Sequence, residues 1–189
     1  MNLHKKLTNQ SVKNQMSDNR FKHTLKVVEN AKKLAAIHKE DIKSAETAAL
    51  MHDFARDWDF ADVIKYLEDR KITIPDDKRN NPILLHGLVA SIIAKEEFNI
   101  NNQDIINSIK NHILGSKNMS NLEKIIFLSD FLSWKDRGAD HQIFEVAQDS
   151  LNKAVVTVYE KTYESLNNDK SPIAKEFYDN WEANKTNNG

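Results

Sequence analysis

The sequence of 189 residues contains no cysteine. This absence excludes a disulfide scaffold, thiolate zinc sites and a cysteine nucleophile, so any metal must be held by His, Asp and Glu side chains. An excess of one charge is absent as well, since 27 basic and 28 acidic residues leave a formal net charge of −1. Because neither sign dominates, the composition predicts neither a nucleic acid nor an anionic membrane as a partner.

Long apolar runs are also missing. The first ten residues, MNLHKKLTNQ, contain no apolar signal-peptide core, and nowhere do about 18 apolar residues follow one another. We therefore expect a cytoplasmic protein that does not span a membrane.

Turn-forming residues are scarce, with four glycines and three prolines in the whole chain. Folds with many strands need more turn formers than this, so helices are the simpler interpretation. We expect an all-α fold in a single domain over residues 1–189, with a helical core over about 18–137 and C-terminal helices over about 141–183. The expected helices cover about 18–37, 41–56, 61–70, a segment that Pro82 opens, 102–114, 121–132, one long helix over 141–166, and 171–183.

Six residues of metal-ligand type lie on five of these helices. His23, for example, is followed by Val27, Ala31 and Leu34 at helical spacing, so its imidazole shares an apolar and therefore inward face. His52 shares the face of a small-residue run that lets a neighbouring helix approach closely. The full set is His23, His52, Asp53, His86, His112 and Asp130.

A single inward histidine is usually a hydrogen-bonded core residue, whereas an inward Asp must find a donor, a cation or a metal. The joint occurrence of six such residues favours a metal site. Imidazoles and carboxylates without thiolates suit iron, manganese, zinc or nickel. Six ligands are too many for one catalytic ion but suit two ions about 3.5 to 4 Å apart, which can clamp a phosphoryl group and activate water. Hydrolysis of a phosphate ester or anhydride is therefore the expected reaction class.

The order His, His-Asp, His, His, Asp resembles the HD-domain phosphohydrolase superfamily. Within it, the chain resembles the bacterial HD-type symmetrical diadenosine tetraphosphatases, the YqeK family, along nearly its whole length. The matching segments are RFKHTLKVVENAKKLA, AALMHDFAR, NNPILLHGLVAS, IKNHILGSKNMSNLEKIIFLSDFL, LNKAV and FYDNW.

The resemblance implies a helical HD fold with two divalent ions, iron above all, with manganese or zinc as alternatives. It implies that His23, His52, Asp53 and Asp130 hold the first ion, that Asp53 bridges to a second ion on His86 and His112, and that a metal-bound hydroxide attacks the substrate. Diadenosine tetraphosphate would then be split symmetrically into two ADP. The resemblance also suggests a homodimer.

Further positions match the family outside the ligand set. By this resemblance Arg56 acts in catalysis and meets substrate phosphate, and Arg20, Ser116 and Lys117 contact phosphate or nucleotide. A guanidinium and a short polar loop beside Gly115 suit phosphate oxygens. Structural roles for Arg20, as a salt-bridge or cap partner, and for Lys117, as a solvated lysine, remain open.

The chain departs from the family after its last aspartate. The family pattern Asp-Tyr-Ile-Glu-Pro, followed by Arg, is here DFLSWKDRGAD, so Ser133 and Trp134 stand at the Glu and Pro positions and Arg137 is the displaced arginine. This change concerns the substrate pocket rather than the metal ligands. Three alternatives therefore stay open: an HD phosphohydrolase for nucleoside monophosphates or cyclic nucleotides, a dinucleotide-binding module without turnover, and a helical adaptor without metal.

Overall fold

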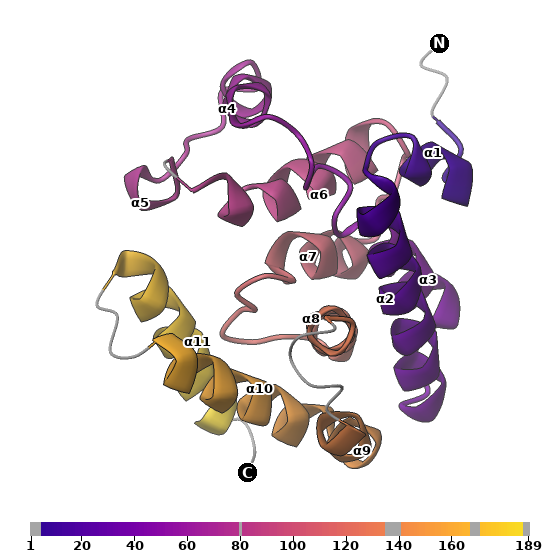
Figure 1. Ribbon diagram of the computed structural model, residues 1–189, viewed down its shortest axis with the longest axis vertical. Helices are drawn as coiled ribbons and strands as arrows, with labels where there is room; N and C mark the ends of the chain where they lie inside the picture. Colours follow the sequence, from indigo (N-terminus) through magenta and orange to yellow (C-terminus); the bar gives the residue numbers. More distant parts are fainter. Residues whose placement is uncertain (1–4, 80, 135–140, 167–170, 187–189) are drawn as a thin grey trace.

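The computed structural model describes residues 5–79, 81–134, 141–166 and 171–186. Within these ranges every regular element is a helix, which confirms the all-α prediction (Figure 1). No helix of the described part is both long and apolar enough to cross a membrane. The elements are α1 (Asn9–Lys13), α2 (Asp18–Ile37), α3 (Ile42–Met51), α4 (Phe60–Glu68), α5 (Asp76–Arg79), the 3₁₀ turn η1 (Pro82–Leu84), α6 (His86–Glu96), α7 (Gln103–Asn111), α8 (Asn121–Leu132), α9 (His141–Asp149), α10 (Leu151–Leu166) and α11 (Pro172–Thr186).

The first two long helices, α2 and α3, form an antiparallel pair whose ends are set by local capping. The Ser17 hydroxyl accepts the backbone N–H of Arg20, and the Asp41 carboxylate accepts that of Ser44. Such caps satisfy donors that the first helical turn leaves without partners. The expected range 18–37 and the expected cap at Asp41 are therefore confirmed. The alanines of α3 are fully buried, at Ala45, Ala48 and Ala49.

Helix α8 lies at the centre of the molecule and is seen end-on in Figure 1. It packs against α2, α3, α7 and α10. Ser120 and Glu123 form a capping box at its start, so its first residue is fixed by hydrogen bonds as well as by packing. Its apolar side chains, such as Ile125, Ile126 and Leu128, are fully buried. A carboxylate near the end of this helix, Asp130, is therefore carried into the interior.

The second expected helix, 41–56, is too long, because α3 ends at Met51. Beyond it the backbone tightens into turns, in which Phe54 N–H donates to Met51 and Arg56 N–H donates to Asp53. On a continuous α-helix, adjacent side chains point about 100° apart. The turns remove this constraint and let neighbouring residues face the same interior region.

The segment between α4 and α6 is less regular, as expected, but it contains one helical turn, α5. Pro82 opens the 3₁₀ turn η1 rather than α6, which begins at His86. The chain thus reaches α6 through a separate short turn.

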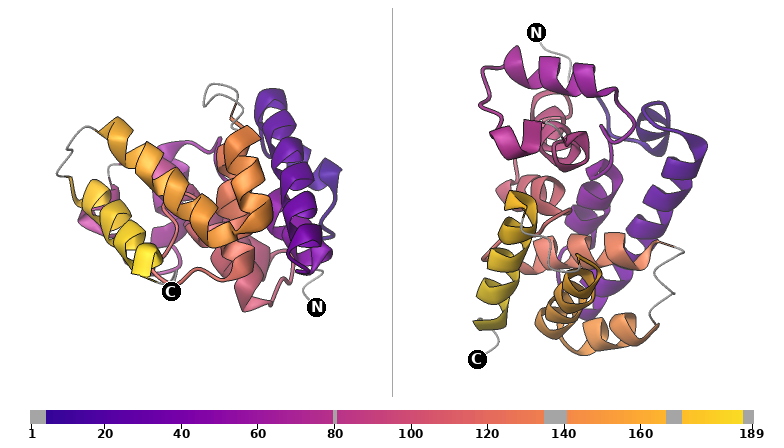
Figure 2. Two further views of the ribbon diagram at one scale, coloured as in Figure 1. Left: turned by 90° about the horizontal axis from the view of Figure 1, so that it is seen from below. Right: turned by 60° about the vertical axis from the view of Figure 1, so that its left-hand side comes forward.

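The expected single helix over 141–166 is wrong, because α9 ends at Asp149 and α10 starts at Leu151. Ser150 separates the two helices, and its hydroxyl accepts the backbone N–H of Lys153. A serine that caps the following helix has a non-helical backbone of its own, which explains the break. The last helix, α11, packs along α10 (Figure 2).

Candidate metal centre

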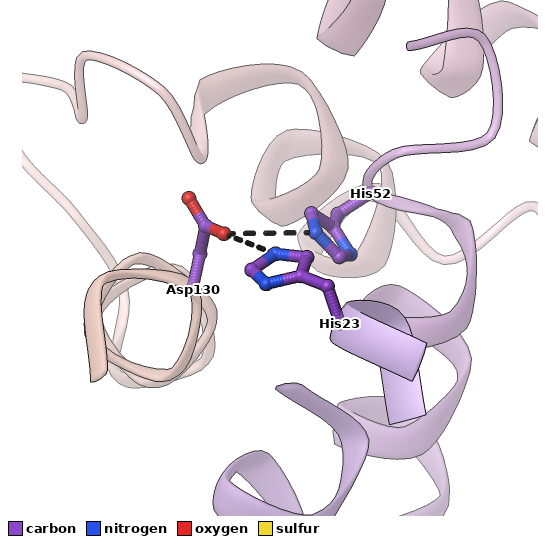
Figure 3. Close-up of side chains that lie close together, drawn as sticks. All are labelled: His23, His52 and Asp130. Atoms are coloured by element: carbon purple, nitrogen blue, oxygen red, sulfur yellow. Dashed lines mark hydrogen bonds and ion pairs between the residues drawn. The ribbon is translucent and has the colours of Figure 1, made fainter. Parts of the chain in front are cut away.

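The six predicted ligands meet in one place, although they span positions 23 to 130 of the chain. His23 lies in α2, His52 and Asp53 follow α3, His86 begins α6, His112 follows α7, and Asp130 lies in the last turn of α8. Figure 3 shows the rings of His23 and His52 converging on one oxygen of Asp130. The donor atoms of His23, His52 and Asp130 lie within 4.8 Å of one another, as do those of His52, Asp53 and His112.

Asp53 lies between two groups of imidazoles and presents a different oxygen to each. Its Oδ2 lies 3.4 Å from His52 Nε2 and 3.8 Å from His23 Nε2. Its Oδ1 lies 3.0 Å from His86 Nε2 and 3.8 Å from His112 Nε2. A carboxylate with this arrangement can contact two cations at once.

Three of the histidines are oriented in the same way. Nδ1 of His52, His86 and His112 lies 2.6, 2.6 and 2.8 Å from the carbonyl oxygen three residues earlier. A carbonyl only accepts, so Nδ1 carries the proton and donates it. For His52 and His112 the acceptors are carbonyls at a helix end, which lack helical partners. In a neutral ring, Nε2 is then left as a lone pair directed into the site, which is the state that binds a metal.

The contacts within the cluster suit a divalent cation. His86 Nε2 and His112 Nε2 lie 3.1 Å apart. Two neutral imidazoles with protonated Nδ1 atoms bring two lone pairs face to face at this distance. His52 Nε2 is fully buried and has no hydrogen-bond partner among the described residues. A cation among these nitrogens and the two carboxylates would accept a lone pair from each of them. The residues present therefore fit a divalent metal ion.

Burial and charge oppose each other in the cluster. Burial lowers the pKa of His52, but the Asp53 and Asp130 carboxylates outweigh it and raise that pKa to about 9. Burial, together with the neighbouring His86 and His52, lowers the pKa of His112 to about 3. Burial would raise the pKa of Asp53, yet His52 and His86 hold it well below its usual value. Burial would also raise the pKa of Asp130, but its hydrogen bond to His23 and the neighbouring His52 keep that pKa below its usual value. The two carboxylates are therefore ionised at neutral pH, and the cluster attracts positive charge.

Arg20 supplies one positive charge next to the cluster. Its Nη1 donates to Asp53 Oδ2 at 3.0 Å, and its Nε lies 3.8 Å from Asp57 Oδ1. The guanidinium also lies 5.1 Å from the ring centroid of Trp134. The same indole packs on His23, with ring centroids 4.6 Å apart. Trp134, at a position where the chain departs from the family pattern, thus covers both a candidate ligand and this arginine.

The remaining predicted site residues lie at different distances from the cluster. Arg56 is half-buried in the turn that contains Asp53. Ser116 donates its hydroxyl to Glu123, and Ser116 and Lys117 line a cavity that contains none of the six candidate ligands. Arg137 lies outside the described residues. The substrate-contact roles of all four therefore stay predictions.

A loop next to His112 is held by residues that the sequence reasoning missed. Tyr159 Oη and Asn180 Nδ2 both donate to the carbonyl of Leu114, at 2.9 and 3.2 Å. Asn184 Nδ2 donates to the carbonyl of Ser116 at 2.8 Å. Three side chains of the C-terminal helices therefore fix the backbone that follows a candidate ligand. Asn180 lies in the segment FYDNW, which matches the family but predicts no role for this side chain.

Gly87 is a second residue that the sequence reasoning missed. A Cβ at this position would lie 2.9 Å from the carbonyl oxygen of Lys110 and 3.3 Å from the ring of His112. Only glycine therefore lets α6 approach the end of α7 this closely. That approach brings the rings of His86 and His112 together.

A cavity of about 160 Å³ opens beside the cluster. His112 and Asp130 form its polar edge, and its walls include Phe127, Phe131 and Phe177. An apolar pocket with a few convergent polar groups is the usual form of a small-molecule site.

Comparison with known proteins identifies the family of the chain. The family model described as HD domain matches residues 20–135. The symmetrical bis(5'-nucleosyl)-tetraphosphatase of Halalkalibacterium halodurans is 33% identical over 166 residues, which cover 87% of this chain and 88% of that protein. The protein of the same name from Staphylococcus aureus is 28% identical over 174 residues, which cover 82% of this chain and 89% of that protein.

A solved structure is similar over nearly the whole chain. It is described as a predicted HD superfamily hydrolase involved in NAD metabolism from Clostridium acetobutylicum. The two chains are 28% identical, with a TM-score of 0.88, and the match covers 97% of this chain and 100% of the other. The fold, the convergence of the His and Asp residues and these relatives agree: the chain belongs to the HD-domain family, within the group of the symmetrical bis(5'-nucleosyl)-tetraphosphatases.

Proposed function

We propose that the protein hydrolyses diadenosine tetraphosphate symmetrically into two molecules of ADP in a reaction that depends on divalent metal. The observation that carries the proposal is the position of Asp53, whose two oxygens face two separate groups of imidazoles. The curated relatives, which carry the name of this activity, support the choice of substrate.

We assign six residues as ligands of two ions. His23, His52 and Asp130 would hold one ion and His86 and His112 the other, with Asp53 between them. Bound there, the ions would supply Lewis-acid stabilisation of phosphoryl oxygens and activation of water.

The chain's own residues would orient the substrate around this centre. Arg20 is fixed by Asp53 and by the indole of Trp134, so its guanidinium has a defined direction for a phosphate oxygen. Arg56 follows Asp53 within the same turn, and we assign it as a further phosphate contact. The cavity beside His112 and Asp130 has apolar walls that would exclude water from the metal centre.

The identity of the metal, the oligomeric state and the cellular location are part of the same proposal. We propose iron as the metal, which the resemblance favours within a donor set that also suits manganese and zinc. We propose a homodimer, and the exposed aromatic rings of Tyr163 on α10 and Tyr178 on α11 support a contact surface there. We propose a cytoplasmic location, which the absence of cysteine fits.

Product identification tests the reaction. We expect the purified protein, supplied with ferrous iron or manganese under reducing conditions, to release ADP as the sole nucleotide product from diadenosine tetraphosphate. The products are separated by anion-exchange chromatography. Release of ATP together with AMP would contradict symmetrical cleavage, and turnover of cyclic nucleotides or monophosphates in place of the dinucleotide would contradict the substrate.

Removal of the metal should lower the stability of the protein. Without a metal ion, the buried carboxylates of Asp53 and Asp130 and the imidazoles around them lose the cation that would hold them together. At a free metal concentration about 100 times the dissociation constant, binding stabilises the folded state by about 2.7 kcal/mol. We therefore expect chelation to lower Tm by about 5 to 10 °C in calorimetry. An unchanged Tm after chelation of a metal-loaded sample would contradict a site in the folded core.

A further inference from the structure

A second and larger cavity lies between α5, α6, α11 and the loop after α7. Its volume is about 560 Å³, against about 160 Å³ for the cavity at His112 and Asp130. None of the six candidate ligands lines it, but the two cavities share Ile113 and Leu114. They therefore adjoin each other directly after the candidate ligand His112.

The lining of this second cavity combines apolar walls with positive charge. Ile72, Leu85 and Leu88 contribute apolar surface, and three lysines lie around it, at Lys78, Lys110 and Lys117. Lys78 is paired with Glu176 at 2.7 Å. Lys110 and Lys117 are exposed, and neither forms an ion pair within 4.0 Å among the described residues. Lys110 thus presents an ammonium group without an ion-paired carboxylate beside an apolar wall, whereas Lys175 and Lys117 together lower the pKa of the Asp179 carboxyl.

One wall of the cavity is a loop that side chains of other helices hold in place. The loop that carries Gly115 and Ser116 lies along it, and the Asn180 amide, itself 5% exposed, donates to Leu114 and Gly115. Because the loop is held by side chains from α10 and α11, the cavity needs no rearrangement to exist. A preformed cavity loses little conformational entropy when it binds a ligand.

We propose that this second cavity binds one nucleoside phosphate half of the dinucleotide substrate, with Lys110 as a phosphate contact. The inference rests on the proposed function, since only a dinucleotide has a second nucleoside to place. Sites for ligands of this size usually have about 300 to 1,000 Å³. The cavity at the metal centre lies below this range and the second cavity lies within it. An apolar wall suits the base, and an unpaired lysine suits the phosphate.

Two variants of the cavity and one control test this proposal. Lys110→Ala removes the cation, and Thr73→Trp fills the cavity from an exposed position on its rim. Lys43→Ala, at an exposed lysine of α3, is the matched control for the loss of charge. We expect Lys110→Ala to raise KM for diadenosine tetraphosphate about tenfold, the effect of losing one charged hydrogen bond. Thr73→Trp should raise KM at least as much, because the indole would occupy the space of the ligand. The control should not change KM.

A second substrate and a binding measurement separate the possible failures. p-Nitrophenyl phosphate has no nucleoside, so the cavity variants should change its KM far less than that of the dinucleotide. ADP binding to the metal-loaded protein, measured by calorimetry, should weaken in both cavity variants. If the wild type hydrolyses the dinucleotide and the variants match it in KM and in ADP binding, the cavity proposal fails and the proposed function stands. If the wild type hydrolyses no dinucleotide, the proposed function fails, and weaker ADP binding in the variants would still support the cavity as a nucleotide site.

Discussion

Replacing Asp53 by Asn is expected to lower kcat/KM for diadenosine tetraphosphate by at least about three orders of magnitude, or about 4 kcal/mol of transition-state stabilisation. The substitution keeps the shape of the side chain but replaces a charged oxygen by an amide. In the wild type, one oxygen of the carboxylate faces His52 and the other faces His86. An amide cannot serve two cations in this way, so the bound metal should fall as well.

The measurement combines steady-state kinetics with metal quantification and far-ultraviolet circular dichroism. Helical signal should be retained, because Asp53 lies outside the helices. Asp62→Asn, an exposed change in α4, is the matched control and should leave both metal content and activity as in the wild type. A variant of Asp53 that keeps both ions and most of its activity would falsify the assignment of this carboxylate as the bridge.

Replacing Gly115 by Ala is expected to destabilise the fold by about 3 kcal/mol, and so to lower Tm by about 6 to 12 °C. Two costs add here. The backbone of Gly115 has φ +69°, which an L side chain rarely adopts, and a Cβ would lie 1.9 Å from Tyr159 Oη. Tyr159 is fully buried between Phe127 and Phe177, so its ring cannot move aside freely. Calorimetry of the metal-loaded protein measures the change.

The double variant Gly115→Ala/Tyr159→Phe isolates the steric part. Removing the hydroxyl loses its hydrogen bond to Leu114 but also removes the atom that the new Cβ would meet. The double variant should therefore be more stable than the sum of the two single changes predicts. Strict additivity would contradict the clash and leave backbone conformation as the main cost.

Local features of the fold were predictable from the sequence, because they depend on residues close together in the chain. The range 18–37 and the start of α8 follow from caps and periodicity within one or two turns. Periodicity alone did not reveal the end of α3 or the break at Ser150. An apolar periodicity continues through both points, while the turn at Asp53 and the cap by Ser150 depend on specific backbone geometry.

The sequence by itself determined which residue types were available for chemistry. The absence of cysteine left His and Asp as metal ligands, and helical periodicity directed the candidates other than Asp53 inward. A residue's own helix decides the face on which its side chain lies, so this part of the site is local information.

Only the tertiary structure decided how these residues meet and what surrounds them. It placed the two oxygens of Asp53 toward different imidazoles and brought Trp134 over His23 and Arg20. It also tied the loop after His112 to Tyr159 and Asn180, which lie 45 and 66 residues from Leu114 in the chain. The physical reason is common to all of these contacts. Each depends on the packing of helices distant in sequence, and no periodicity within a single helix encodes the partner it will contact.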